Sequence, residues 1–186
     1  GTVVDAHGRR AALVPELVDG AIVLRVSADF LAHAAFPVVV DPVVTLVHID
    51  STTSDTFSSD VAWDPTEQGW LVVYEQVYSA TDTDVYAKFL SSSGAVLLTG
   101  TVDFTSTAWH APRCANLAAA QQFLVVAEVE SGLTRSVMGR TIEPSGAIFV
   151  QSSQFPVSDG SAGNKVHPDV GGDTYPIEPS YYCVVW

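Results

Sequence analysis

Hydrophobic residues from about residue 60 onward fall into short, strand-length runs separated by polar turns, and these runs repeat. The run Leu71–Glu75 (LVVYE) returns as Leu124–Glu128 (LVVAE). A glycine turn follows each run, at Gly94 and at Gly146, and a third copy begins at Pro168. A period of about 50 residues with four short strands is typical of a β-propeller blade. We therefore predict an all-β fold with about two and a half propeller-like repeats, and a β-sandwich with an internal duplication is the alternative.

The first 50 residues follow another pattern, which predicts a small N-terminal β unit. Ala21–Val26 and Phe36–Val40 read as strands, and Ser27 is a suitable N-cap for a short helix over residues 28–34. Residues 51–60 (STTSDTFSSD) are polar and read as a linker. We thus expect a β module over residues 1–50, a linker over 51–60, and repeats over 61–111, 112–167 and 168–186, the last of them incomplete.

Charge narrows the range of partners. The chain carries 8 basic and 21 acidic residues, a formal net charge of −13. Binding to nucleic acid or to an anionic membrane surface needs clustered Lys and Arg, so both are excluded as expected partners. No apolar run reaches the length of a membrane-spanning helix. Abundant Ser and Thr, scarce Lys and a pI near 4.4 favour a secreted or cell-surface bacterial protein.

The two cysteines are candidates for one disulfide. Cys114 lies on the first expected strand of the second copy, and Cys183 lies on the second strand of the third copy. In a propeller these strands belong to neighbouring blades, so a bridge would fasten the last unit to the array. Two free thiols are the alternative.

Glu75 and Glu128 occupy the same position in their repeats and are the candidate acid–base pair. Two carboxylates facing one cleft can hydrolyse a glycosidic bond. The alternative is that each glutamate ends its strand and has a structural role or faces solvent.

Asp82 and Asp84 alternate with Thr83, and clustered carboxylate oxygens are what Ca²⁺ prefers. We take these two aspartates as a candidate Ca²⁺ site, with solvated turn residues as the alternative. No cysteine or histidine spacing matches a zinc site. His110 and His167 lie just before the prolines that open copies two and three, so a role in packing is expected for both.

Aromatic residues are frequent, and most are expected in the core between sheets. Trp70 and Tyr78 are the candidates for the surface, where an aromatic ring can stack on a sugar or contact a protein ligand.

Two sets of motifs resemble known bacterial sequences. Asp5–Arg9 (DAHGR) and Phe36–Pro42 (FPVVVDP) are similar to a module of large exported multidomain proteins, with a DxxGR turn and a closing A-[FY]-P-V-x-V-D-P strand. Leu71–Glu75, Asp84–Lys88 and Gly94 resemble a repeat with the motifs LVVWED, DIYGQR and a later glycine. The resemblance implies a secreted, β-rich repeat protein and no particular activity. The second copy departs from it where residues 135–137 (RSV) replace the segment containing the aspartate.

Together these observations predict an extracellular, non-catalytic β-repeat module used for scaffolding or for binding carbohydrate or protein. The alternative is a fragment of a propeller-type glycoside hydrolase or lyase that uses Glu75 or Glu128. A short repeat array leaves sheet faces and edges unpaired, so we expect the rest of a longer chain, or another chain, to complete it by strand pairing at Tyr182–Trp186.

Overall fold

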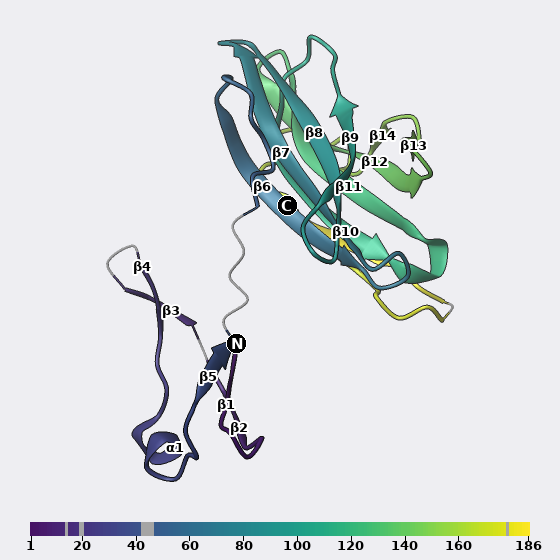
Figure 1. The fold of residues 1–186 in the computed structure, drawn as a ribbon. Helices are drawn as coiled ribbons and strands as arrows, with labels where there is room; N and C mark the ends of the chain where they lie inside the picture. Colours follow the sequence, from purple (N-terminus) through teal and green to yellow (C-terminus); the bar gives the residue numbers. More distant parts are fainter. Residues whose placement is uncertain (14, 19–20, 42–46, 178) are drawn as a thin grey trace. The chain divides into compact units, whose positions relative to one another are not determined.

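The computed structural model describes residues 1–13, 15–18, 21–41, 47–177 and 179–186. The chain forms two compact units, Gly1–Leu46 and Val47–Trp186 (Figure 1). The described ranges contain antiparallel β-sheets and one short α-helix, which confirms the all-β prediction. Within these ranges, no helix is long and apolar enough to cross a membrane.

The first unit is a small β structure with its own core. Its elements are β1 (Thr2–Val4), β2 (Arg10–Ala12), β3 (Pro15–Val18), β4 (Ala21–Leu24), α1 (Ala28–Ala32) and β5 (Val39–Asp41). Strand β1 lies between β2 and β5, while β3 and β4 form a separate hairpin. The helix begins as predicted, because the Ser27 hydroxyl accepts the Phe30 amide hydrogen bond. Val3, Leu13 and Phe30 are the buried residues of this core.

Asp5 explains the turn motif of this unit. Its carboxylate accepts hydrogen bonds from the amides of His7 (3.0 Å), Arg9 (2.8 Å) and Ala35 (3.1 Å). The bond from Ala35 is the largest of the contacts that lower the pKa of Asp5. The residue therefore joins the Gly8 turn, where φ is +80°, to the segment that leads into β5.

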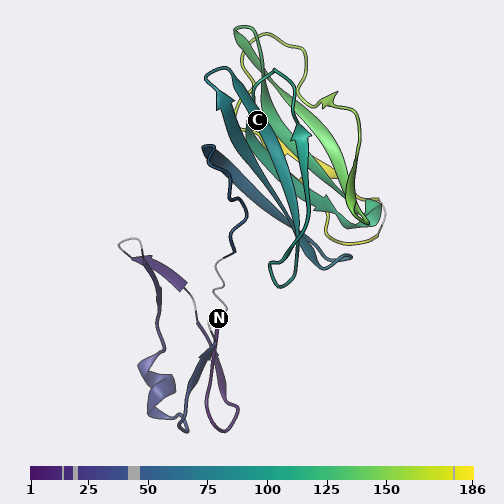
Figure 2. The same cartoon turned by 45° about the horizontal axis from the view of Figure 1, so that its top comes forward.

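The second unit contains three β-structures in chain order. The first sheet is β6 (Thr56–Asp64), β7 (Gly69–Ser79), β8 (Asp82–Ser91) and β9 (Val96–Asp103). The second sheet is β10 (Trp109–Leu117), β11 (Gln122–Ser131), β12 (Thr134–Ser145) and β13 (Ile148–Gln151), with β14 (Phe155–Pro156) on β12 and the short 3₁₀ helix η1 (Ala118–Ala120) between β10 and β11. The third hairpin is β15 (Asp169–Gly172) with β16 (Tyr182–Val185). Each sheet is an antiparallel meander whose strands follow one another (Figures 1 and 2).

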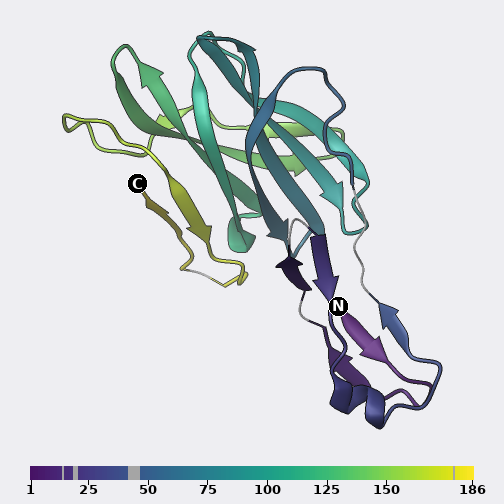
Figure 3. The same cartoon turned by 90° about the vertical axis from the view of Figure 1, so that its left-hand side faces the viewer.

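The second sheet is covered on both faces. Phe123 and Val125 face the first sheet and join Leu71 and Val73 in the largest core of the molecule. The intervening residues Leu124 and Val126 face the other way, and residues 170, 182 and 184 of the third hairpin pack there (Figure 3). A strand that is buried on both sides reads as a continuous apolar run, which explains the LVVA sequence of residues 124–127.

The pairing registers show that the three structures are repeats. Asp60 pairs with Val73, Arg113 with Val126 and Asp169 with Val185, each at the same step of its hairpin. In the first and second sheets the ladder is interrupted just before this pair, by an irregularity between Phe57 and Asp60 and between His110 and Arg113.

A residue with positive φ lies at this point in all three copies. These residues are Ser58 (φ +45°), Ala111 (φ +48°) and His167 (φ +56°). Non-glycine residues rarely adopt this conformation, so its recurrence marks a common structural requirement. His167 therefore corresponds to Ala111. The sequence had suggested instead that His167 corresponds to His110, because both histidines lie just before a proline.

The predicted linker over residues 51–60 differs from the structure in one respect. Strand β6 begins at Thr56, so residues 56–60 belong to the first sheet. Phe57 pairs with Glu75 next to an irregularity in the ladder, and there polar and apolar side chains do not alternate along the strand. The polar sequence of residues 56–60 therefore did not reveal the strand.

Candidate functional site

The two glutamates that occupy equivalent repeat positions are both buried. Glu75 lies on β7 and Glu128 on β11, near the end of the second strand of each sheet. A buried carboxylate is costly unless it is paired and hydrogen-bonded, so their partners determine what they do.

Glu75 contacts the beginning of β10 in the second sheet. Its Oε1 accepts a hydrogen bond of 2.6 Å from the Ala111 amide, and its Oε2 lies 3.4 Å from Nδ1 of His110. Ala111 can direct its amide toward the first sheet because of the positive φ described above. The glutamate of one sheet thus accepts a main-chain hydrogen bond from the next sheet.

Glu128 makes the corresponding contact one repeat later. Its Oε1 accepts a hydrogen bond of 2.7 Å from the His167 amide, just before β15. Its Oε2 accepts a hydrogen bond of 2.8 Å from Nη1 of Arg135, on the neighbouring strand β12. The same sheet-to-sheet hydrogen bond therefore occurs twice, between the first and second sheets and between the second sheet and the third hairpin.

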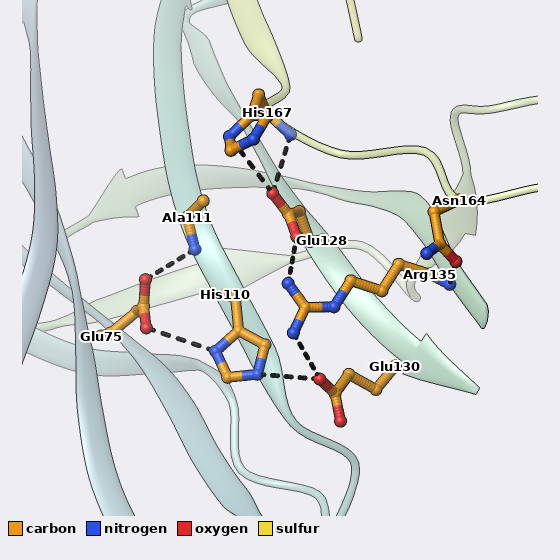
Figure 4. A network of polar contacts seen from close by, with 8 residues as sticks. All are labelled: Glu75, His110, Ala111, Glu128, Glu130, Arg135, Asn164 and His167. Atoms are coloured by element: carbon orange, nitrogen blue, oxygen red, sulfur yellow. Dashed lines mark hydrogen bonds and ion pairs between the residues drawn. The ribbon is translucent and has the colours of Figure 1, made fainter. Parts of the chain in front are cut away.

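Three further residues, His110, Glu130 and Arg135, link the glutamates into one network. Nε2 of His110 lies 3.5 Å from Oε1 of Glu130, and Nη2 of Arg135 donates to the same oxygen at 2.7 Å. The hydrogen bonds to Glu128 and then Glu130 raise the pKa of Arg135, so its guanidinium stays charged. We call Glu75, His110, Glu130, Arg135 and Glu128 the glutamate network (Figure 4).

All four carboxylate oxygens of Glu75 and Glu128 have a partner in this arrangement. A general acid or nucleophile must reach a substrate, and here each carboxylate already accepts a main-chain hydrogen bond. The chemistry that this arrangement performs directly is the fastening of one sheet to the next.

Three members of the network were missed by the sequence analysis as contributors to the site: His110, Glu130 and Arg135. The sequence pattern could have indicated two of them. Glu128 and Glu130 share a face of β11, and Arg135 is the direct cross-strand partner of Glu130. The contact of His110 with Glu75 depends on how two sheets stack, for which the sequence carries no local signal.

The structure does not bring Trp70 and Tyr78 together. Both lie on β7 and both are exposed, but Trp70 packs against Trp63 with ring centroids 4.7 Å apart. The Tyr78 hydroxyl contacts that of Tyr86 and accepts a hydrogen bond of 3.0 Å from Gln76. A cavity of about 250 Å³ on the same sheet includes neither ring; it is lined by Ile49, Asp50, Thr56, Ser59, Val72 and Tyr74.

A larger cavity, of about 360 Å³, lies beside the glutamate network. It is lined by Arg135, Lys165 and the small polar residues Ser131, Thr134, Ser136, Asp159, Gly160, Ser161, Ala162 and Gly163. Both cations have partners, since Arg135 binds two glutamates and the Lys165 ammonium donates to the Ser161 carbonyl at 3.1 Å.

Asp82 and Asp84 lie at the start of β8, and Asp84 is buried. Burial, and then the nearby charges of Asp82 and Asp103, raise the pKa of Asp84 to about 6. Oδ1 of Asp103 lies 3.6 Å from Nη2 of Arg140. In the described part of the chain, no three His, Cys, Asp or Glu side chains are grouped so that they could hold a metal ion.

The predicted disulfide between Cys114 and Cys183 is not formed, and both residues are free thiols. Cys114 is buried between the first two sheets, with its Sγ 3.9 Å from the Leu71 carbonyl oxygen. Cys183 is exposed and pairs with Gly171, while the adjacent Val184 packs on the second sheet. The two side chains therefore point to different sides of the repeat array.

Comparison with protein-family models, with curated proteins and with solved structures gives no match for this chain.

Proposed function

We propose that the chain is an extracellular, non-catalytic β-repeat module that serves as a scaffold and binding surface. The observation that supports this most strongly is the repeated hydrogen bond from each glutamate to the next sheet, at 2.6 Å for Glu75 and 2.7 Å for Glu128. Residues at equivalent positions with the same contact hold a repeat array together, whereas a catalytic pair needs two different environments.

A binding role for this module rests on its exposed aromatic rings. Trp70 and Tyr78 offer apolar faces to solvent on one strand, and such rings stack on sugars or contact protein ligands. Because they lie eight positions apart on β7, they would contact an extended ligand such as an oligosaccharide and not a single sugar.

A Ca²⁺ ion at Asp82 and Asp84 belongs to the same proposal. The Asp84 side chain is buried, and within the described ranges it makes no hydrogen bond or ion pair. Calcium would be expected to raise the melting temperature of the wild-type protein and not that of Asp84→Asn. An equal response of both proteins would remove Ca²⁺ from the proposal.

The experiment that tests the function combines a glycan array with hydrolysis assays on aryl glycosides. We expect binding without turnover, a loss of binding on Trp70→Ala or Tyr78→Ala, and unchanged binding on Glu75→Gln. Circular dichroism would show that each variant is folded. Turnover that disappears in a folded Glu75→Gln or Glu128→Gln variant would instead establish the hydrolase alternative.

A further inference from the structure

The cavity of about 250 Å³ on the first sheet lies between the two exposed aromatic rings of β7. Val72 and Tyr74 line it from the sheet, and they point away from the main core because the intervening Val73 packs into that core. On the same face of the strand, Trp70 precedes these residues by two positions and Tyr78 follows them by four. An extended ligand that reaches both rings must therefore pass over the cavity.

The segment before the first sheet supplies another wall of the cavity, through Ile49 and Asp50. Lys88, the cross-strand partner of Val72, holds this segment against the sheet. Its ammonium donates to the Ile49 carbonyl, lies 3.6 Å from Oδ1 of Asp50 and lies 5.7 Å from the centre of the Tyr74 ring. Both side chains of the ion pair are largely buried, so the wall is a fixed part of the fold.

The polar groups that line the cavity have unused capacity for hydrogen bonds. Tyr74 is 5% exposed, and none of the described residues hydrogen-bonds to its hydroxyl. Within the described ranges the same is true of the hydroxyls of Thr56 and Ser59. Oδ2 of Asp50 accepts a hydrogen bond from Thr52, and a carboxylate oxygen can accept a second. A polar group as buried as Tyr74 is normally paired, and the cavity is the space from which a partner can reach it.

The protonation states of the lining groups are also defined. The hydrogen bond from the Thr52 hydroxyl is the largest of the contacts that lower the pKa of Asp50, so this residue is a carboxylate and accepts hydrogen bonds. Burial, and then the nearby Asp50 and Tyr78, raise the pKa of Tyr74 to about 12, so its hydroxyl keeps its proton. The cavity therefore presents a charged acceptor beside a neutral donor.

Size and charge together favour a neutral group that is rich in hydroxyls. A water molecule occupies about 30 Å³ in the liquid, so the cavity has room for about eight waters or for one sugar ring. An acidic group would be repelled by Asp50 and by the formal net charge of −13, and a basic group would compete with Lys88 for Asp50. An apolar group would leave the carboxylate and the hydroxyls unpaired.

We propose that this cavity is the subsite for one neutral sugar residue of an oligosaccharide whose two ends extend toward Trp70 and Tyr78. Asp50 accepts hydrogen bonds from the hydroxyls of this sugar, and the hydroxyls of Tyr74 and Thr56 donate to its oxygens. The proposal rests on the proposed function as a binding module and adds the class of ligand, a neutral carbohydrate, and the residue that selects it.

The test is an NMR titration with neutral hexasaccharides of glucose, xylose or mannose and with an acidic hexasaccharide of galacturonic acid. At least one neutral sugar should shift the amide signals of Ser59 and Tyr74, and the acidic sugar should not. Thr56→Leu places a larger, apolar side chain in the cavity, and Asp50→Asn removes the charged acceptor. Each variant should weaken binding of the neutral sugar by about 10-fold or more.

Two matched variants serve as controls. Thr99→Leu changes an exposed threonine of β9, in the same sheet, which is outside the lining of the cavity. Asp55→Asn removes an exposed carboxylate that is also outside this lining. Both controls should bind like the wild type, and circular dichroism would show that all four variants are folded.

The outcomes separate this proposal from the proposed function. Neutral sugar binding that is lost in Trp70→Ala or Tyr78→Ala but unchanged in folded Thr56→Leu and Asp50→Asn would overturn the subsite and leave the binding module standing. Equal affinity for the acidic and the neutral hexasaccharides would overturn the choice of ligand. A wild-type protein that binds none of these sugars would overturn the proposal and, with it, carbohydrate as the ligand of the module.

Discussion

Glu75 of the first sheet and Ala111 of the second are joined by a 2.6 Å hydrogen bond, although they are 36 positions apart in the chain. The acceptor is a buried carboxylate, and the donor is the amide of a residue with positive φ. Glu128 and His167 repeat the same relationship one sheet later, at 2.7 Å. Charge-assisted hydrogen bonds of this kind are stronger than those between neutral groups, which suits a contact that sets the spacing of sheets.

Replacement of Glu128 by Gln should lower the free energy of unfolding by about 2 kcal/mol. Gln keeps an acceptor for the His167 amide but loses the charge that pairs with Arg135, and its amide group would face a guanidinium donor. The partly exposed position of Arg135 keeps the effect below that of a fully buried pair. Urea unfolding measures the change, and Glu67→Gln, in an exposed turn, is the control. Equal midpoints for the two variants would contradict the assignment.

Gly172→Ala should detach the third hairpin from the second sheet. A Cβ at Gly172 would lie 2.0 Å from the main-chain oxygen of Asn116, so β15 must move away from β10. We expect a loss of about 2 kcal/mol or more and faster proteolysis near residues 173–177. Gly171→Ala is a matched control in the adjacent position, because nothing lies within 4 Å of its Cβ. Identical proteolysis of the two variants would show that the hairpin does not pack as described.

Thiol labelling should distinguish the two cysteines. Cys183 is exposed and is expected to react at once with a thiol reagent in the native protein. Burial raises the pKa of Cys114 well above its ordinary value, so this thiol should react only after unfolding. The expected titre is one thiol in buffer and two in denaturant. A titre of zero in denaturant without reductant would mean that the disulfide exists.

Asp84 should make stability depend on pH in the acidic range. Its folded pKa of about 6 lies above the ordinary value of 3.8, so the folded protein binds this proton more tightly than the unfolded chain does. The contribution of the group to stability is therefore greatest below about pH 4 and decreases as pH rises to about 6. Asp84→Asn removes this dependence, so its melting temperature should exceed that of the wild type increasingly across this window. Asp55→Asn, at an exposed aspartate, is the control, and parallel profiles for wild type and Asp84→Asn would contradict the prediction.

The repeat and its strands could be predicted from the sequence because they follow from local patterns. The runs at residues 71–75 and 124–128 gave the period, and the turns at Gly94 and Gly146 have the positive φ that glycine favours. The equivalence of Glu75 and Glu128 followed from the same alignment of copies.

The partners of these glutamates could not be predicted in this way. Ala111 and His167 meet them only because sheets stack face to face in one register, and that stacking depends on the whole core around Trp109 and Phe123. The disulfide prediction failed for a related reason: adjacency of two strands does not show which faces Cys114 and Cys183 occupy. Successive side chains of a strand point to opposite faces of the sheet, so a shift of one position moves a side chain from one face to the other.

The central claim is that each glutamate fastens its sheet to the next through one main-chain amide, and amide hydrogen exchange measured by NMR tests it most directly. In Glu75→Ala the Ala111 amide should exchange about 10-fold faster or more, while the His167 amide stays as in the wild type. In Glu128→Ala the His167 amide should exchange faster and the Ala111 amide should not. Glu75→Gln and Glu128→Gln keep a side-chain oxygen that can accept the amide hydrogen bond, so they are the controls, and exchange in them should change much less than in the alanine variants. Unchanged exchange at Ala111 in Glu75→Ala and at His167 in Glu128→Ala would contradict the account.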